Sequence, residues 1–188
     1  RLLGINTPEK NMPGYQEAKD FLAQFEGKLI EMEKTKEDKD KYGRLLRYTF
    51  YQSRFLNEEI LASGLATLYY YNEDKYTPEL KKAEGRAREQ EFGMWQKSQD
   101  ICVNCIKLKK LNNIDPGEFV ILGNDCDFSC NLNGWIIKDD ANHIFKLNFA
   151  IPASSEKRID YNGSIWNDDK DSFYLRDKEG KLVIFYRY

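Results

Sequence analysis

The chain has little histidine and no long apolar run. His143 is the only histidine among 188 residues, and we expect it to be a surface or packed residue in a strand of the second half, so a histidine-based mechanism is excluded. No apolar run approaches the roughly 20 residues of a membrane helix, and no signal peptide precedes Arg1. The sequence therefore predicts a globular protein without a transmembrane segment.

A charge excess of either sign is also absent. The chain has 29 Lys and Arg against 31 Asp and Glu, a net charge of -2. Residues 1–101 hold 17 basic and 18 acidic side chains, and the remainder holds 12 and 13. Proteins that grip duplex DNA by its backbone usually carry a basic stripe. Charge therefore gives no support for tight nucleic-acid binding, although local chemistry on a phosphate stays open.

Composition and length indicate two domains. With 41% hydrophobic and 14% aromatic residues, the chain can bury real cores, and a prior of roughly 150 residues per domain allows two small ones. The polar stretch from Gln96 to Asp100 is the best boundary. We expect domains at residues 1–99 and 100–188.

The first half mixes strands and helices. Strands are predicted at residues 1–5, 28–34 and 44–52. Helices are predicted at 15–25, at 57–66 with Asn57 as N-cap, and from Thr77-Pro78 to Trp95. This pattern favours a small β-barrel packed with helices.

The second half is all β. Apolar runs at 106–109, 119–122, 135–137, 173–175 and 182–186 are separated by turn residues such as Asn133-Gly134 and Glu179-Gly180. Short strands at this spacing predict a β-sandwich. We expect Trp135 to lie in its core.

Two segments of the first half could hold and attack a phosphodiester. They are Arg1-Leu-Leu-Gly-Ile-Asn-Thr-Pro-Glu9 and Asp40-Lys-Tyr-Gly-Arg44. Alone, Glu9 would be an ordinary surface carboxylate and Arg44 an ordinary salt-bridge donor. Together they provide one carboxylate to activate water and two guanidiniums that match phosphate oxygens. The combination predicts an active site for phosphodiester cleavage.

From Arg1 to Trp95, these motifs, together with Asn57-Glu-Glu-Ile60, resemble the staphylococcal-nuclease-like thermonucleases. The resemblance implies an OB-fold barrel of five strands and hydrolysis of DNA or RNA. It assigns Glu9 as the general base and gives Arg1 and Arg44 the role of holding the phosphate and stabilising its transition state. Tyr42, Tyr70 and Tyr71 are candidates for nucleotide binding, with core aromatics as the alternative reading of the last two.

The resemblance also implies a calcium ion, and here the chain departs from the pattern. Asn6 replaces one Asp ligand, Thr7 supplies a carbonyl, and the second Asp would lie upstream of Arg1. An amide oxygen brings no charge, so weak calcium binding is expected. Two barrel strands would also lie upstream, which leaves unpaired edges and allows domain exchange. A weakened or inactive nuclease fold that binds nucleic acid or protein is the alternative function.

The second half resembles the lamin tail domain, an immunoglobulin-like β-sandwich. The matching segments are Gly117-Glu-Phe-Val-Ile-Leu-Gly-Asn124, Leu132-Asn-Gly-Trp-Ile-Ile-Lys-Asp-Asp140 and Trp166-Asn-Asp-Asp-Lys-Asp-Ser-Phe-Tyr-Leu-Arg-Asp177. The resemblance implies no catalytic residues. It implies tethering or binding of a partner that the sequence does not identify.

Four cysteines stand near the start of the second half, at Cys102, Cys105, Cys126 and Cys130. Four thiolates at this spacing suit a structural zinc site. The other reading is two disulfides, Cys105 with Cys126 and Cys102 with Cys130. Either role is structural, and disulfides would fit an extracellular or cell-surface protein.

Overall fold

Two compact units make up the chain, Arg1–Gln96 and Lys97–Tyr188. The computed structural model describes residues 1–188 except 71, 115–116, 142, 162, 164 and 168. Each unit has its own hydrophobic core. Within the part of the chain so described, no helix has the length and apolar character needed to cross a membrane.

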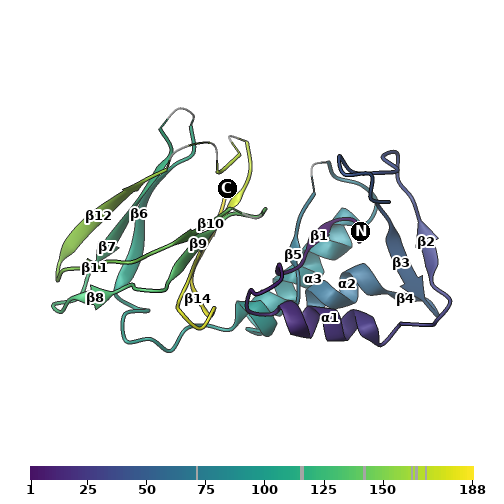
Figure 1. Cartoon of the computed structure of the whole chain (residues 1–188), viewed down its shortest axis with the longest axis horizontal. Coiled ribbons are helices and arrows are strands. Elements are labelled where there is room, and N and C mark those ends of the chain that lie inside the picture. Colours follow the sequence, from purple (N-terminus) through teal and green to yellow (C-terminus); the bar gives the residue numbers. More distant parts are fainter. Residues whose placement is uncertain (71, 115–116, 142, 162, 164, 168) are drawn as a thin grey trace. The chain divides into compact units, whose positions relative to one another are not determined.

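Unit 1 combines two small sheets with three α-helices (Figure 1). Its elements are β1 (Ile5–Asn6), α1 (Tyr15–Ala23), β2 (Glu31–Glu33), β3 (Tyr48–Tyr51), β4 (Arg54–Phe55), α2 (Leu56–Ala62), β5 (Thr67–Leu68), α3 (Thr77–Glu89) and the short 3₁₀ helix η1 (Gly93–Trp95). Antiparallel pairing gives the sheets β2-β3-β4 and β1-β5. Helix α2 contacts β3, β4 and α3, so it forms the middle layer of the unit.

Two helix predictions in unit 1 were partly wrong. Helix α2 begins at Leu56 with Phe55 as its N-cap, and Asn57 lies inside the helix with 0% of its surface exposed. Its side chain bonds other segments instead of its own helix. Helix α3 ends at Glu89, and η1 is separate because the backbones of Gly64 and Gly93 meet there, with the Met94 N–H donating to the Gly64 carbonyl at 2.9 Å.

Unit 2 is built from two larger sheets and one short pair of strands. The strands are β6 (Ile106–Asn112), β7 (Phe119–Asn124), β8 (Cys130–Asn131), β9 (Ile136–Lys138), β10 (Ile144–Lys146), β11 (Ala150–Ile151), β12 (Ser155–Asp160), β13 (Ser172–Arg176) and β14 (Leu182–Arg187). The sheet orders are β12-β7-β6 and β10-β9-β13-β14, and β8 pairs with β11. One core holds side chains of both sheets.

Burial in unit 2 confirms Trp135 as a core residue, with 1% of its surface exposed. The strand prediction for His143 was wrong. His143 immediately precedes β10, and its backbone N–H and Nδ1 both contact the carboxylate of Asp139, at 3.0 and 2.7 Å. This local contact holds the residue in the turn between β9 and β10.

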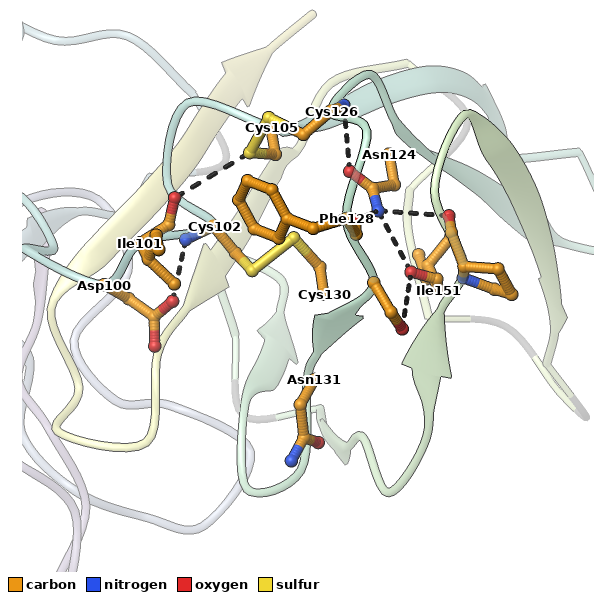
Figure 2. Close-up of a disulfide and its surroundings, with 12 residues drawn as sticks. Asp100, Ile101, Cys102, Cys105, Asn124, Cys126, Phe128, Cys130, Asn131 and Ile151 are labelled. Carbon is orange, nitrogen blue, oxygen red and sulfur yellow. Dashed lines mark hydrogen bonds between the residues drawn. A yellow bond between two sulfur atoms is a disulfide. The ribbon is translucent and has the colours of Figure 1, made fainter.

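The four cysteines form two disulfides, Cys102–Cys130 and Cys105–Cys126 (Figure 2). Their Cα atoms are 5.7 and 5.2 Å apart. This is the pairing considered from the sequence, and it leaves none of these four residues a thiolate for zinc. The buried Asn124 stabilises the loop that carries Cys126. Its Nδ2 donates to the carbonyls of Phe128 and Ile151, and its Oδ1 accepts the Cys126 N–H at 3.1 Å.

Candidate active site

Two segments that carry the predicted arginines run side by side in unit 1. Leu2 forms a parallel bridge with Arg47. The Arg47 N–H donates to the Arg1 carbonyl at 3.1 Å, and the Arg1 amino group donates to the Leu45 carbonyl at 2.7 Å. Residues 1 and 44 are therefore neighbours in space.

A tight turn from Asp40 to Arg44 orients the Arg44 side chain. Asp40 Oδ1 accepts the backbone N–H groups of Tyr42 and Arg44, both at 2.9 Å, and Oδ2 accepts Arg44 Nε at 2.6 Å. Gly43 has φ of 79°, a left-handed conformation that suits glycine. The Arg44 side chain is still 51% exposed. Its Nη groups donate no hydrogen bond to any residue that the structure describes, so they remain available for an anion.

The Asp40 carboxyl is held in its charged form. Partial burial raises its pKa, but the hydrogen bonds from Arg44 and Tyr42 outweigh this effect and bring the pKa below its ordinary value. A carboxyl with a lowered folded-state pKa contributes stability above its ordinary pKa, about 3.9, and this contribution is lost as the pH falls through the lower folded value. The Asp40–Arg44 pair is therefore formed at neutral pH.

Each of the two guanidiniums lies near a tyrosine ring. The Arg44 guanidinium carbon is 5.2 Å from the ring centroid of Tyr42, and that of Arg1 is 5.5 Å from the centroid of Tyr69. Both distances are in the range of cation–π attraction. Tyr42 was a predicted site residue. Tyr69 was not, although the run of tyrosines that begins at this position was the available signal.

The other predicted tyrosines lie differently. Tyr70 is half-buried and packs against the core of unit 1. Its ring centroid is 5.3 Å from Lys81 Nζ, and its hydroxyl lies 3.5 Å from Glu73 Oε1. Tyr71 lies outside the described residues. The structure therefore places the Tyr42 ring beside Arg44, and it packs Tyr70 against the core of unit 1.

Glu9 lies three residues beyond β1, the strand that follows the Arg1 segment. Thr7 and Pro8 are half-buried, Glu9 is exposed, and its carbonyl accepts the Met12 N–H at 2.9 Å in the following turn. The turn fixes the backbone at Glu9, and the residue is exposed to solvent.

Asn6 and Thr7 were the predicted calcium ligands. Asn6 pairs with Thr67 in the β1-β5 sheet, and Thr67 Oγ1 donates to its carbonyl at 3.4 Å. Calcium takes six to eight oxygen ligands, usually with several carboxylates. Among the described residues, no group of three or more His, Cys, Asp or Glu could hold a metal ion, and the Asp40 oxygens are already engaged. Among the described residues, Asn6 and Thr7 therefore supply too few oxygen ligands for more than weak calcium binding.

Asn57 links both arginine segments to the core. Its Oδ1 accepts the backbone N–H of Thr49 at 2.9 Å and the Thr49 hydroxyl at 2.8 Å. Its Nδ2 donates to the carbonyls of Leu3 at 2.8 Å and Arg47 at 3.4 Å. Because Leu3 and Arg47 belong to the paired segments described above, Asn57 sets the spacing between them. This linking role of Asn57 was not predicted from the sequence.

Asn57→Ala is expected to destabilise unit 1 by roughly 2–4 kcal/mol, since the Thr49 N–H and the Leu3 carbonyl lose their side-chain partner. Urea unfolding measures the change. Asn72→Ala, at an exposed position, serves as the matched control and should stay within about 0.5 kcal/mol of the parent. Equal stabilities of the two variants would contradict the linking role.

Comparison with known proteins places the first half of the chain in a family. The family described as "Staphylococcal nuclease homologue" matches residues 1–97. The chain is 29% identical over 103 residues to a thermonuclease of Staphylococcus hyicus, covering 50% of this chain and 61% of that protein. It is 38% identical over 99 residues to the staphylococcal-like nuclease CAN1 of Arabidopsis thaliana, covering 52% and 29%.

A third relative is the SPbeta prophage-derived endonuclease YokF of Bacillus subtilis, 32% identical over 108 residues that cover 52% of this chain and 36% of that protein. The chain spans less than two thirds of the length of each of these relatives. All three matches cover about half of this chain, in agreement with the family match to residues 1–97. That match spans more than half of the 188 residues, and the chain belongs to the family of staphylococcal nuclease homologues.

Proposed function

We propose that the chain hydrolyses phosphodiester bonds of DNA or RNA, with Glu9 as general base and Arg1 and Arg44 as phosphate clamps. The main support is that the two arginine segments lie next to each other. The Arg44 side chain is half-exposed, and its Nε donates to Asp40, which fixes the guanidinium in place. Relatives named thermonuclease and endonuclease support the same reaction class.

The proposed chemistry needs only positioning and charge. A water oxygen attacks phosphorus while Glu9 takes one of its protons, the bond from phosphorus to the leaving oxygen breaks, and the leaving oxygen takes a proton from solvent. Negative charge spreads over the phosphate oxygens in the transition state, where the guanidiniums of Arg1 and Arg44 stabilise it. The ring of Tyr42 beside Arg44 limits the freedom of that side chain. No step is assigned to calcium.

Arg44→Ala is expected to lower the cleavage rate of single-stranded DNA by about 10³-fold or more, the range found for arginines that stabilise phosphoryl transfer. The matched control is Arg54→Ala. Arg54 is another half-exposed arginine of unit 1, and its guanidinium donates two hydrogen bonds to the Glu59 carboxylate. Release of acid-soluble fragments measures the rate. Equal rates for the two variants would exclude Arg44 from the site.

Asn6→Asp is expected to tighten calcium binding roughly tenfold, because a carboxylate adds charge where the amide has none. Titration calorimetry measures the affinity. Asn11→Asp adds the same charge at an exposed turn position and should leave the affinity unchanged. An equal response to both substitutions, or none to either, would remove Asn6 from the ligand set.

A second candidate function is binding without cleavage. It is favoured by Asn6, whose amide oxygen brings no charge to a metal ion. In that case the chain would retain single-stranded DNA in a binding assay, and Arg44→Ala would weaken retention, while no fragments appear with or without calcium. The two functions therefore give different outcomes in one pair of assays.

We infer that unit 1 is an OB-fold domain and unit 2 a lamin-tail-like, immunoglobulin-like sandwich that tethers it or binds a partner. The two sheets of unit 2 on one core support the second assignment. In unit 1, Leu29 just before β2 is 92% exposed and Met32 within β2 is 63% exposed, which suits pairing with further strands, from this protein or by domain exchange. The disulfides support an oxidising, extracellular location.

A further inference from the structure

An open groove of about 800 Å³ runs along unit 2 between β6 and β14. The two strands are edges, β6 of the sheet β12-β7-β6 and β14 of the sheet β10-β9-β13-β14. Apolar side chains such as Leu108 and Ile184, which also pack on the core, form part of its lining. The groove is thus a seam where the core of unit 2 reaches the surface, and it contains none of the residues assigned to hydrolysis.

Every charged side chain among the described lining residues is a lysine, namely Lys107, Lys109 or Lys110. Lys109 forms an ion pair with Asp125 at 2.6 Å. Lys107 and Lys110 make no ion pair with any residue that the structure describes. In a protein with a net charge of -2, this rim is a local concentration of positive charge, and it suits an anionic ligand.

Tyrosines complete the lining, Tyr186 on β14 and Tyr188 directly after it. Tyr186 pairs across the sheet with Phe173, which is fully buried, so both side chains start from the inner face. The Tyr186 side chain is nevertheless 48% exposed because it lies at the seam. The ring of Tyr188 is 6.1 Å away, and the Tyr188 hydroxyl donates to the Asn167 carbonyl at 2.9 Å. The groove therefore offers an accessible aromatic ring beside a tethered one.

We propose that this groove binds single-stranded nucleic acid, with Lys107 and Lys110 at phosphates and a base stacked on Tyr186. A cationic groove with aromatic side chains is the combination that binds single strands without sequence preference, because every base has a stacking face. Lysine reaches phosphates with a flexible, strongly charged end group. The site would increase the local concentration of nucleic acid whether or not unit 1 cleaves it.

An added peptide strand is the competing occupant, and the geometry disfavours it. Two strands that flank a third must lie roughly 9.6 Å apart, whereas Cα atoms of β6 and β14 approach within 8 Å. Lysines on an edge strand also oppose strand addition. A nucleic-acid strand needs no hydrogen bonds from the backbone of these edge strands, so it can bind through the side chains of the groove alone.

The test measures binding in a background that cannot hydrolyse, Glu9→Gln with Arg44→Ala, in chelator. Fluorescence anisotropy follows a labelled oligothymidylate of about 12 nucleotides. Lys107→Glu with Lys110→Glu should weaken binding at least tenfold and reduce the slope of log affinity against log salt by about 1.4. Tyr186→Ala should weaken it about tenfold. Thermal melts confirm that each variant is folded.

The matched control is Lys146→Glu with Lys178→Glu, two exposed lysines of unit 2 outside the groove. This pair changes the net charge equally and should alter binding less than about twofold. Equal losses in both pairs would overturn the proposal, since net charge alone would then explain binding. Unchanged oligothymidylate binding by the groove variants would also overturn the proposal, because the lysines would then only protect the strand edge. In a competition assay, displacement of the labelled strand by polyglutamate as effectively as by unlabelled oligothymidylate would overturn base stacking.

Discussion

Replacing Glu9 with glutamine is expected to slow hydrolysis of single-stranded DNA by about 10²–10⁴-fold, the range for loss of a general base. Glutamine has the same size but cannot take the proton from the attacking water. The arginine pair is untouched, so DNA binding measured in chelator should change little. Since Glu9 is exposed, the free energy of unfolding should also stay within about 0.5 kcal/mol. Initial rates at saturating DNA, with binding and unfolding curves, separate these effects.

The matched control for Glu9 is Glu26→Gln, another exposed glutamate of unit 1. It removes the same charge in the turn after α1, at a residue that is not part of the predicted site, and should leave the rate unchanged. A rate for Glu9→Gln equal to that of the control would exclude Glu9 as the base. A parallel fall in rate and in DNA affinity would instead assign Glu9 to binding.

Removal of the Cys102–Cys130 disulfide by double alanine substitution is expected to destabilise unit 2 by about 3–4 kcal/mol. The bond closes a loop with a sequence separation of 28, and the entropy of the unfolded chain rises when that loop opens. Cys102 and Cys130 are also buried, at 3% and 0% exposed, so the alanines leave a small cavity. Urea unfolding followed by fluorescence of the buried Trp135 and Trp166 reports on unit 2.

Two controls accompany the disulfide prediction. Removal of Cys105–Cys126, with a separation of 21 and only one of its cysteines fully buried, should cost about the same or less. Thiol titration of the denatured parent should find no free thiol. Four free thiols, or a loss below about 1 kcal/mol in both variants, would contradict a structural role for the disulfides.

Elements with a strong local pattern could be predicted from the sequence. Helix α1 begins where its apolar stripe begins, at Tyr15, and α3 begins at Thr77 ahead of a proline that suits a first turn. Strand β12 was missed because its sequence, Ser-Glu-Lys-Arg-Ile-Asp, is polar and has only one residue, Ile159, in the core. Its partner β7 decides its conformation, and pairing of this kind has no local signal.

The site residues also divide into those with a local sequence signal and those placed by long-range contacts. Arg1, Glu9 and Arg44 stand in recognisable motifs, and the four-residue spacing of Asp40 and Arg44 makes their ion pair a local feature. Asn57 looked like an N-cap because asparagine favours that position. Its actual partner Leu3 lies 54 residues away, and only the folded chain brings the two together. Tyr69 was missed because its neighbour Arg1 is likewise far away in the sequence.

The most direct test of the proposed nuclease is the time course of cleavage of end-labelled single-stranded DNA by the purified chain and by Arg44→Ala prepared in parallel. We expect fragments to accumulate with the parent chain and to form at least about 10³-fold more slowly with the variant. Fragments formed at the same rate by both proteins would contradict this expectation.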